Sequence, residues 1–443
     1  MKSKGLLTAS FLLLVLSAVI WWSNKKAATA DKTPAETATV KLVNIPEDQI
    51  QNIEIKKRAG ETIKLQRNDS QWQITSPKQL RADPDAVSSM LSTLAPLSSD
   101  RTVEEKATSV DQYGLTQPTI ELSIADKNNK TTKLLIGDET PAGTAVYAAI
   151  AGDPRVYALS SYKKNSLDKQ LNDLRDKRLL SFDSDKVSSI ELTAKKQIMA
   201  FGRSKDQWQI VRPKPFRADS SQVEELLRTL RDAKIDLSRS EDDKKVSTAF
   251  SSGALFATAK VTDVSGTQEL QVRKNKDDYY AKSSVVAGIY KIASATGTGL
   301  DKSLDDFRNK KLFDFGYADP EKIELHDGPK SYFLTRSGSD WWSNGTKMDA
   351  GTVSALMGKI RDLSASKFPD AGFTAPLLDL TVTSDGGKRV EKVLLSKTGD
   401  NYEAKRENEP ALYELTASSV SELQKSAADL KPAPAPAPAP KKK

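Results

Sequence analysis

Few residues of this sequence are of the types that carry out catalysis. His326 is the only histidine, and the chain has no cysteine. A catalytic triad, a histidine general base or a histidine-based metal site would each need His326. It follows the alternation Ile323-Glu-Leu325 with no patterned acidic residues nearby, which favours a hydrogen-bonded or exposed loop histidine. The lack of cysteine excludes disulfides, thiol catalysis and thiolate metal sites. The sequence therefore predicts a protein with no enzymatic activity, cofactor or metal.

The other side chains that could do chemistry belong to an internal repeat. A sixteen-residue stretch beginning at Trp72 returns at Trp208, with nine identical positions at an offset of 136. The shared pattern is W-x-I-x-x-P-x-x-x-R-A-D-x-x-x-V, and a weaker third copy begins at Trp342. In that copy the loop to Asp349 is four residues shorter and lacks the proline and the arginine. Because such repetition decides the fold, the chain is interpreted as a repeat protein.

The charged residues of the pattern have two possible roles. Asp83 and Asp219 could act as metal ligands or catalytic carboxylates, but each directly precedes a helical pattern, where aspartate is a preferred N-cap. We therefore expect helix caps. Arg81 and Arg217 could bind an anionic ligand or a partner. We favour pairing of each arginine with a carboxylate or carbonyl group inside its own repeat.

The tryptophans could stack on sugars or anchor the core. Trp72 and Trp208 alternate with polar residues, as in a half-buried strand that ends at Pro77 and Pro213. A strand that leads into a core helix favours burial of Trp72, Trp208 and Trp342 as core anchors. Trp342 is also kept as a candidate contact for a ligand or partner.

Regular elements must position these residues. In the first repeat three short strands are expected, of which the third is Trp72-Gln-Ile74 at the start of the pattern. In every copy an apolar helical stripe follows the aspartate. A turn with Gly114 comes next, recurs with Gly372 and is missing from the second copy. More strands and a second helix close each repeat. The stripes are Val87, Leu91, Leu94 and Leu97; Val223, Leu227 and Leu230; and Val353, Met357, Ile360 and Leu363.

This order predicts an α+β fold with three tandem repeats of about 130 residues. Each repeat is expected to hold a mostly antiparallel sheet and two helices, behind one N-terminal transmembrane helix. The expected segments are an anchor (1–23), a flexible tether (24–45), three repeats (46–178, 179–311 and the degenerate 312–430) and an Ala-Pro/Lys tail (431–443).

The N-terminal segment directs the chain to a membrane. Residues 5–22 are largely apolar and would span about 27 Å as a helix, close to the thickness of a bilayer core. The alternative is a cleaved signal peptide with Ala28-Thr29-Ala30 as the cleavage site. Both would export the rest of the chain. We expect a single-pass anchor in the bacterial inner membrane, with the body on the periplasmic side.

The net charge of +8 does not indicate nucleic-acid binding. Four lysines precede Asp31 and four follow Asp429, so the body between them is neutral and lacks the basic face that phosphate binding needs. The tail is an extended spacer ending in three lysines, either merely solvated or in weak contact with an anionic surface. Basic clusters at Arg175–Arg178 and Arg308–Lys311 are interpreted as surface charge at helix C-termini.

The repeated W-x-I-x-x-P-x-x-x-R-A-D motif, the Y-G-L-x-x-P turn and the N-terminal anchor together resemble the bacterial domain-of-unknown-function 4340 family. The resemblance covers about 46–430. Members of that family look like membrane-anchored envelope proteins, often encoded beside ABC transporters of the gliding-motility type. The resemblance implies an accessory role at the envelope and supplies no activity.

Two hypotheses about function follow. The first is a binding or scaffold protein with protein partners in the envelope, including an ABC-type transporter complex. The alternative is a periplasmic protein that binds or processes cell-wall glycan. Buried tryptophans would favour the first hypothesis, and exposed, co-planar tryptophans would favour the second.

Overall fold

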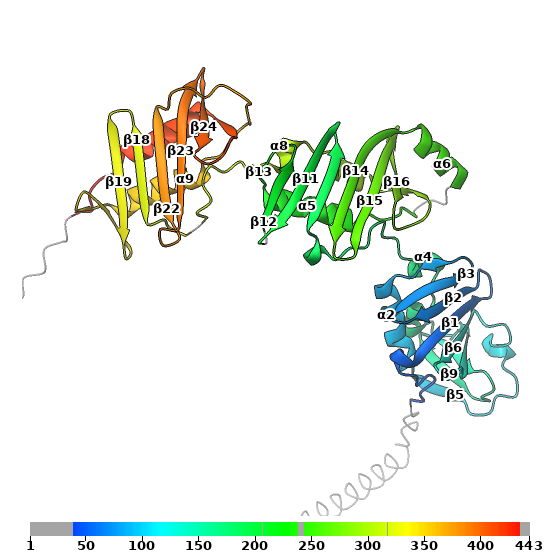
Figure 1. Cartoon of the computed structure of the whole chain (residues 1–443). Helices are drawn as coiled ribbons and strands as arrows, with labels where there is room; N and C mark the ends of the chain where they lie inside the picture. Colours follow the sequence, from blue (N-terminus) through cyan, green and yellow to red (C-terminus); the bar gives the residue numbers. More distant parts are fainter. Residues whose placement is uncertain (1–38, 206, 238–242, 317, 435–443) are drawn as a thin grey trace, which may run out of the picture. The chain divides into compact units, whose positions relative to one another are not determined.

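The computed structural model describes residues 39–434 except 206, 238–242 and 317 (Figure 1). The expected anchor (1–23), most of the tether (24–45) and most of the tail (431–443) lie outside the described residues. The end of the expected tether is not a free linker, because Leu42 and Val43 are buried in the core of the first repeat and both donate their N–H groups to the Leu97 carbonyl. Within the described part of the chain, no helix is both long and apolar enough to cross a bilayer. The described residues divide into two compact units, with the boundary along the chain between Lys177 and Arg178. The first unit holds one sheet and the second holds two.

The α+β class is confirmed by three sheets in which all pairings between described strands are antiparallel. The first sheet has the spatial order β4 (Leu80–Arg81), β3 (Gln71–Ser76), β2 (Ile63–Asn68), β1 (Ile50–Lys57), β6 (Ile120–Asp126), β7 (Thr131–Glu139), β8 (Ala145–Ile150), β9 (Val156–Ser160) and β5 (Arg101–Glu104). The second has the order β13 (Phe216–Arg217), β12 (Gln207–Arg212), β11 (Gln197–Ser204), β10 (Ser189–Ala194), β14 (Ala254–Asp263), β15 (Gly266–Asn275), β16 (Asp278–Ser283) and β17 (Ile289–Ile292). The third has the order β21 (Thr346–Lys347), β20 (Asp340–Ser343), β19 (Lys330–Ser337), β18 (Lys322–Asp327), β22 (Leu378–Ser384), β23 (Arg389–Thr398), β24 (Asn401–Arg406) and β25 (Leu412–Leu415). The strand order is the same in all three except for the added β5, so each sheet with its helices is called a repeat below.

The helices differ more between repeats than the strands do. The first repeat has α2 (Pro84–Leu94), α3 (Ser161–Leu167) and α4 (Leu171–Leu174); the second has α5 (Ser220–Arg231), α6 (Asp243–Ser252), α7 (Ser294–Gly299) and α8 (Leu304–Phe307); the third has α9 (Ala350–Asp362) and α10 (Ala417–Ala428). Short 3₁₀ turns are η1 (Glu47–Gln49), η2 (Asp111–Tyr113) and η3 (Ser184–Lys186). The expected second helix is thus two short helices in each of the first two repeats. Helix α6 was not expected from the sequence pattern.

Each repeat has a core between one sheet face and its helices. In the three repeats, α2 packs against α3 and α4, α5 against α7 and α8, and α9 against α10. The buried helical side chains are Val87, Met90, Leu91 and Leu94; Val223, Leu226, Leu227 and Leu230; and Val353, Leu356, Met357 and Ile360. Each such side chain, fully buried, contributes roughly 1.5–3 kcal/mol. The helical stripes therefore hold the helices on the sheets.

An aspartate caps the first helix of each repeat. Asp83 Oδ1 accepts hydrogen bonds from the backbone N–H groups of Asp85 and Ala86, at 3.0 and 3.1 Å. Asp219 Oδ1 accepts from two N–H groups in the same way. Asp349 Oδ1 accepts from Thr352 N–H at 3.0 Å. These carboxylates satisfy backbone donors that a helix leaves free at its start, so the structure gives them a local role.

The opposite face of each sheet is covered only in part. In the first two repeats the connection after the first helix packs over the later strands of this face, near Leu115 in the first repeat and with α6 in the second. Gly114 lies in this connection with φ 68°, and a Cβ there would collide with the Asp138 carboxylate. Gly372, with φ 132°, is pressed in the same way against Glu403. The earlier strands of this face are not covered by any described helix, and they are called the open face below.

Candidate functional site

The repeated tryptophan occupies a fixed place in the first two repeats. Trp208 is 2% exposed and lies in the core of the second repeat. Its Nε1–H donates to Glu224 Oε1 at 2.6 Å, and Arg203 lies over its ring at 5.6 Å. Trp72 is half-buried and packs against the core of the first repeat. Both side chains therefore point inward, although Trp72 does so less completely.

In the third repeat the buried tryptophan is Trp341, and the expected alignment on Trp342 is off by one residue. Trp341 is 5% exposed and pairs across the strands with Arg336, as Trp208 pairs with Arg203. Trp342 is 38% exposed. Successive side chains of a strand point to opposite faces, so a shift of one residue exchanges core for surface.

The loop between the tryptophan and the capping aspartate is also different in the third repeat. Pro77 and Pro213 directly follow β3 and β12, and both peptide bonds before them are cis. In the third repeat the two-residue turn Asn344-Gly345 replaces this loop, with positive φ at both residues, as a tight hairpin requires. Counted from Trp341, three residues are lost rather than four. The arginine position is occupied by Lys347, whose Nζ lies 2.8 Å from Asp340 Oδ2.

Arg81 holds the end of its own repeat. Its Nη2 lies 3.2 Å from Oδ2 of Asp176, which is buried. The backbone pairs as well, because Asp176 N–H donates to the Arg81 carbonyl at 2.9 Å. Arg81 thus fastens the segment that leaves the first repeat, which is the type of partner expected from the sequence.

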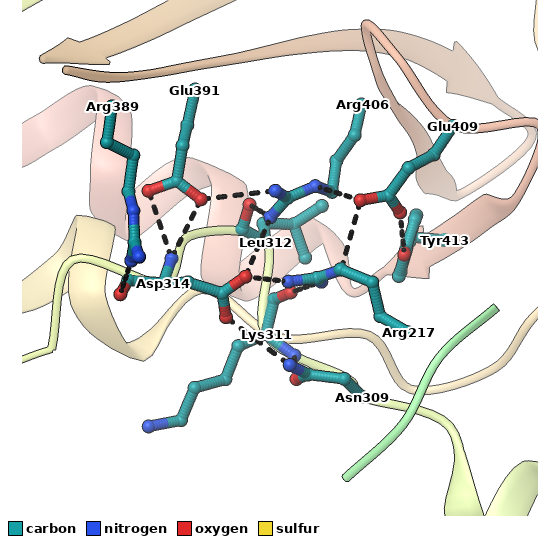
Figure 2. Close-up of polar contacts among 10 residues, drawn as sticks. All are labelled: Arg217, Asn309, Lys311, Leu312, Asp314, Arg389, Glu391, Arg406, Glu409 and Tyr413. Atoms are coloured by element: carbon teal, nitrogen blue, oxygen red, sulfur yellow. Dashed lines mark hydrogen bonds and ion pairs between the residues drawn. The ribbon is translucent and has the colours of Figure 1, made fainter. Parts of the chain in front are cut away.

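Arg217 occupies the same position in the second repeat but has different partners. Asn309, the counterpart of Asp176, donates its N–H to the Arg217 carbonyl at 2.9 Å. The Arg217 guanidinium instead reaches the third repeat (Figure 2). It contacts the Asp314 carboxylate and the Lys311 carbonyl, and its Nε lies 3.1 Å from Glu409 Oε1. The expectation that Arg217 pairs inside its own repeat (179–311) holds for the Lys311 carbonyl but is wrong for the carboxylates, because Asp314 and Glu409 belong to the third repeat.

A second arginine continues this network within the third repeat. Arg406 Nη2 donates to Glu391 Oε1 at 3.1 Å, and Arg406 Nε lies 2.8 Å from Glu409 Oε1. Glu391 is buried and accepts from the backbone N–H of Asp314 at 3.0 and 3.1 Å. Arg389 donates to the Asp314 carbonyl at 2.6 Å. The ion cluster, defined as Arg217, Asp314, Arg389, Glu391, Arg406 and Glu409, holds three positive and three negative charges and is self-neutralising.

Tyr413 closes one side of the ion cluster. It is buried, and its hydroxyl donates to Glu409 Oε2 at 2.7 Å. Burial, with the hydrogen bond to Glu409, raises the pKa of Tyr413 to about 12. Burial alone would lower the pKa of Arg217, but its neighbours Tyr413, Asp314 and Glu409 raise it. Both groups therefore keep their neutral-pH protonation over the physiological range.

Arg308 is not the surface charge expected from its basic cluster. Its guanidinium lies 4.2 Å from the ring centre of Phe216 and 3.7 Å from that of Phe368, and the residue is 8% exposed. Burial lowers its pKa from the usual value. A cation between two rings is stabilised by about 0.5–2 kcal/mol per contact. Arg175, its counterpart, is also 8% exposed.

The open face of the third sheet carries an aromatic strip, defined as His326, Phe333 and Trp342. Phe333 is exposed like Trp342, and its ring lies 5.3 Å from that of His326 in an edge-on arrangement. His326 belongs to β18 rather than to a loop, and its Nδ1 is 2.8 Å from Ser331 Oγ. Thr335 pairs with Trp342 and is two residues from Phe333, so Phe333 and Trp342 share one face.

Two features gave no signal in the sequence. Glu403 is buried beneath Gly372, burial raises its pKa, and its Oε2 has no hydrogen-bond partner among the described residues. A hollow of about 670 Å³ lies beside α6 and is lined by Lys244, Lys245 and Lys276 among others. No group of three or more potential metal ligands occurs among the described residues. The arrangement therefore offers ion pairing and apolar contact.

Comparison with known proteins gives one match. The model of a domain of unknown function, DUF4340, matches residues 72–248 and again 208–379. The two matches begin at Trp72 and Trp208, the same offset that separates the first two copies of the motif. No curated protein and no solved structure matches the sequence. Because the matched regions together span more than half of the 443 residues, the chain belongs to the DUF4340 family.

Proposed function

We propose that this protein is a non-enzymatic scaffold that binds protein partners at the bacterial envelope. Residues 1–23 anchor it as a single-pass protein in the inner membrane, and the tether is the part of 24–45 that precedes Val40, where the chain joins the core of the first repeat. Three tandem repeats with the boundaries 46–178, 179–311 and 312–430 stand on the periplasmic side. The support for the anchor is the apolar run of residues 5–22.

The aromatic strip on the open face of the third sheet is the observation that carries this proposal. Trp342 and Phe333 are 38% and 39% exposed. Aromatic residues are enriched at the centres of protein interfaces, where they bury large areas at low entropic cost. The sheet edges are poorer sites. The two-residue edge strands β4, β13 and β21 are followed by residues that bridge to the segment leaving the repeat.

The partner we propose is an envelope protein, with an ABC-type transporter complex as the main candidate. A neutral body supports a protein partner over nucleic acid, because phosphate binding needs clustered positive charge. The lysines of 431–443 would add a weak contact to an anionic surface.

The experiment is affinity purification of the full chain from crosslinked membranes. We expect one or a few membrane or periplasmic proteins to be recovered with the unmodified chain. The double variant Trp342→Ala/Phe333→Ala should recover much less of them. A matched control is Tyr162→Ala, which removes an exposed aromatic ring of the first repeat and should not reduce recovery. Recovery of no envelope protein would contradict the scaffold role.

The glycan alternative rests on Trp342 alone among the described tryptophans. One exposed indole can stack on a sugar ring, but Trp208 and Trp341 are buried and Trp72 is half-buried. A pull-down with isolated cell-wall glycan separates the two functions. Binding that is lost in Trp342→Ala, with no protein partner recovered, would favour the glycan.

A further inference from the structure

The junction between the second and third repeats is more than a linker. The segment 308–314 makes backbone contacts on both sides. Asn309 N–H donates to the Arg217 carbonyl of the second repeat at 2.9 Å, and Leu312 N–H donates to the Leu363 carbonyl of the third at 3.0 Å. The residue after Asn309 is bound as well, because the Lys310 carbonyl accepts a hydrogen bond from Ala365 N–H at 2.8 Å. The segment between the two repeats is therefore held by backbone hydrogen bonds.

Side chains join the two repeats across this segment. Phe216 of the second repeat packs against the cores of both the second and the third repeat. Together with Phe368 of the third repeat it encloses the Arg308 guanidinium. The next residue, Arg217, donates to Asp314 and lies against Glu409. Two adjacent residues of β13 therefore supply one apolar and one ionic connection to the third repeat.

Two backbone groups at the start of the third repeat bind different side chains from their counterparts in the second repeat. At the start of the second repeat, Ser181 N–H donates to Gln268 Oε1 at 2.8 Å, and the Ser283 hydroxyl donates to the Leu179 carbonyl. At the start of the third repeat the corresponding backbone groups bind the charged side chains of Glu391 and Arg406. The same backbone positions are thus served by neutral groups in one repeat and by charged groups in the next.

We infer that Arg217 is a conformational lock that makes the second and third repeats move as one rigid body. Its guanidinium is the member of the ion cluster contributed by the second repeat, and it is 19% exposed. Removing it leaves Asp314 and Glu409 without one of their cations at a partly buried site, where unpaired charge is costly. The other ionic contacts of the cluster are internal to the third repeat and its linker, so the two repeats are then joined only by the segment 308–314 and the apolar contacts of Phe216, about which the third repeat turns.

The lack of cysteine allows a direct test on the full chain in detergent. Spin labels are attached at Ile198→Cys in the second repeat and Leu377→Cys in the third, both exposed and outside the ion cluster. Double electron–electron resonance then gives the distribution of distances between the labels. We expect a single narrow peak for the labelled chain and loss of that peak, by broadening, in Arg217→Met. The matched control Arg81→Met, at the same position of the first repeat, should keep the narrow peak.

Two further variants keep the test decisive if Arg217→Met does not fold. Arg217→Lys keeps the charge but loses the planar fork that contacts two groups at once, so an intermediate width is expected. Glu409→Gln removes one acceptor and should broaden the peak while the circular dichroism spectrum stays unchanged. A peak that stays narrow in the folded Arg217 variants, or that is already broad in the labelled parent, would overturn the lock.

Discussion

The first and third repeats build the same three-residue device from different parts of the chain. In the first repeat, the Tyr157 hydroxyl donates to Asp153, and Arg155 contacts that carboxylate and lies 5.6 Å over the ring. The hydrogen bond from Arg155, against the effect of burial, lowers the pKa of Asp153 to about 2. All three residues belong to one short stretch.

In the third repeat, Tyr413 and Glu409 take the places of the tyrosine and the carboxylate. The arginine over the ring is Arg217, at 5.9 Å, and it comes from the preceding repeat. The difference lies in where the arginine comes from: within one stretch of the chain in the first repeat, and from the preceding repeat in the third. The first device stabilises a hairpin, and the second ties neighbouring repeats together.

The largest loss of stability is expected when the repeated tryptophan is replaced. Trp72 and Trp208 occupy equivalent positions but differ in burial, so the two variants can be compared. Trp208→Ala should lower the free energy of unfolding of its repeat by about 3–5 kcal/mol, as truncation of a core aromatic does. Trp72→Ala should cost roughly half as much, because part of the ring already contacts solvent. Chemical denaturation of both variants measures this. Nearly unchanged midpoints would mean that both rings are exposed.

The helix cap comes next and tests whether the degenerate third copy works like the others. Asp349→Ala should cost about 1 kcal/mol, and Asp219→Ala a similar amount, because each leaves backbone N–H groups of a helix start without an acceptor. Thermal melts of the two variants give the comparison. A much smaller loss for Asp349→Ala would mark the third helix as held by packing alone.

The two tyrosine devices should respond alike to high pH. Burial raises the pKa of both Tyr157 and Tyr413 to about 12, above the usual tyrosine value of 10.0. The unfolded chain therefore loses these protons first, so the stabilisation is complete below pH 10 and is lost as the pH rises towards 12. Tyr157→Phe and Tyr413→Phe should each reduce this alkaline loss in denaturation curves, at a cost of about 1 kcal/mol at neutral pH. If only one variant does so, the two devices are not equivalent.

The smallest effect is expected at the exposed ring beside Trp341. Trp342→Ala should change the free energy of unfolding by less than about 0.5 kcal/mol, as surface substitutions usually do. Trp341→Ala should behave like Trp208→Ala. A larger loss of stability for Trp342→Ala than for Trp341→Ala in urea denaturation would mean that Trp342 is the buried residue.

Local patterns in the sequence determined the parts of the fold that depend on near neighbours. The capping aspartates, the helical stripes and the strand before each proline follow from residues within about four positions of one another, where backbone geometry sets the contacts. The 136-residue offset also determined the repeat, because equal sequences in equal contexts fold alike.

Tertiary structure alone decided what pairs across long distances. Whether Trp341 or Trp342 enters the core depends on the strand register. Two adjacent tryptophans fit either register equally well, so the sequence does not reveal which one is buried. Arg81 and Arg217 have the same local sequence, yet one finds Asp176 and the other finds Asp314, 97 residues away. Each arginine pairs with the carboxylate that the packed sheets bring within hydrogen-bonding distance. The local sequence does not determine this partner, because a guanidinium can pair with any carboxylate placed there.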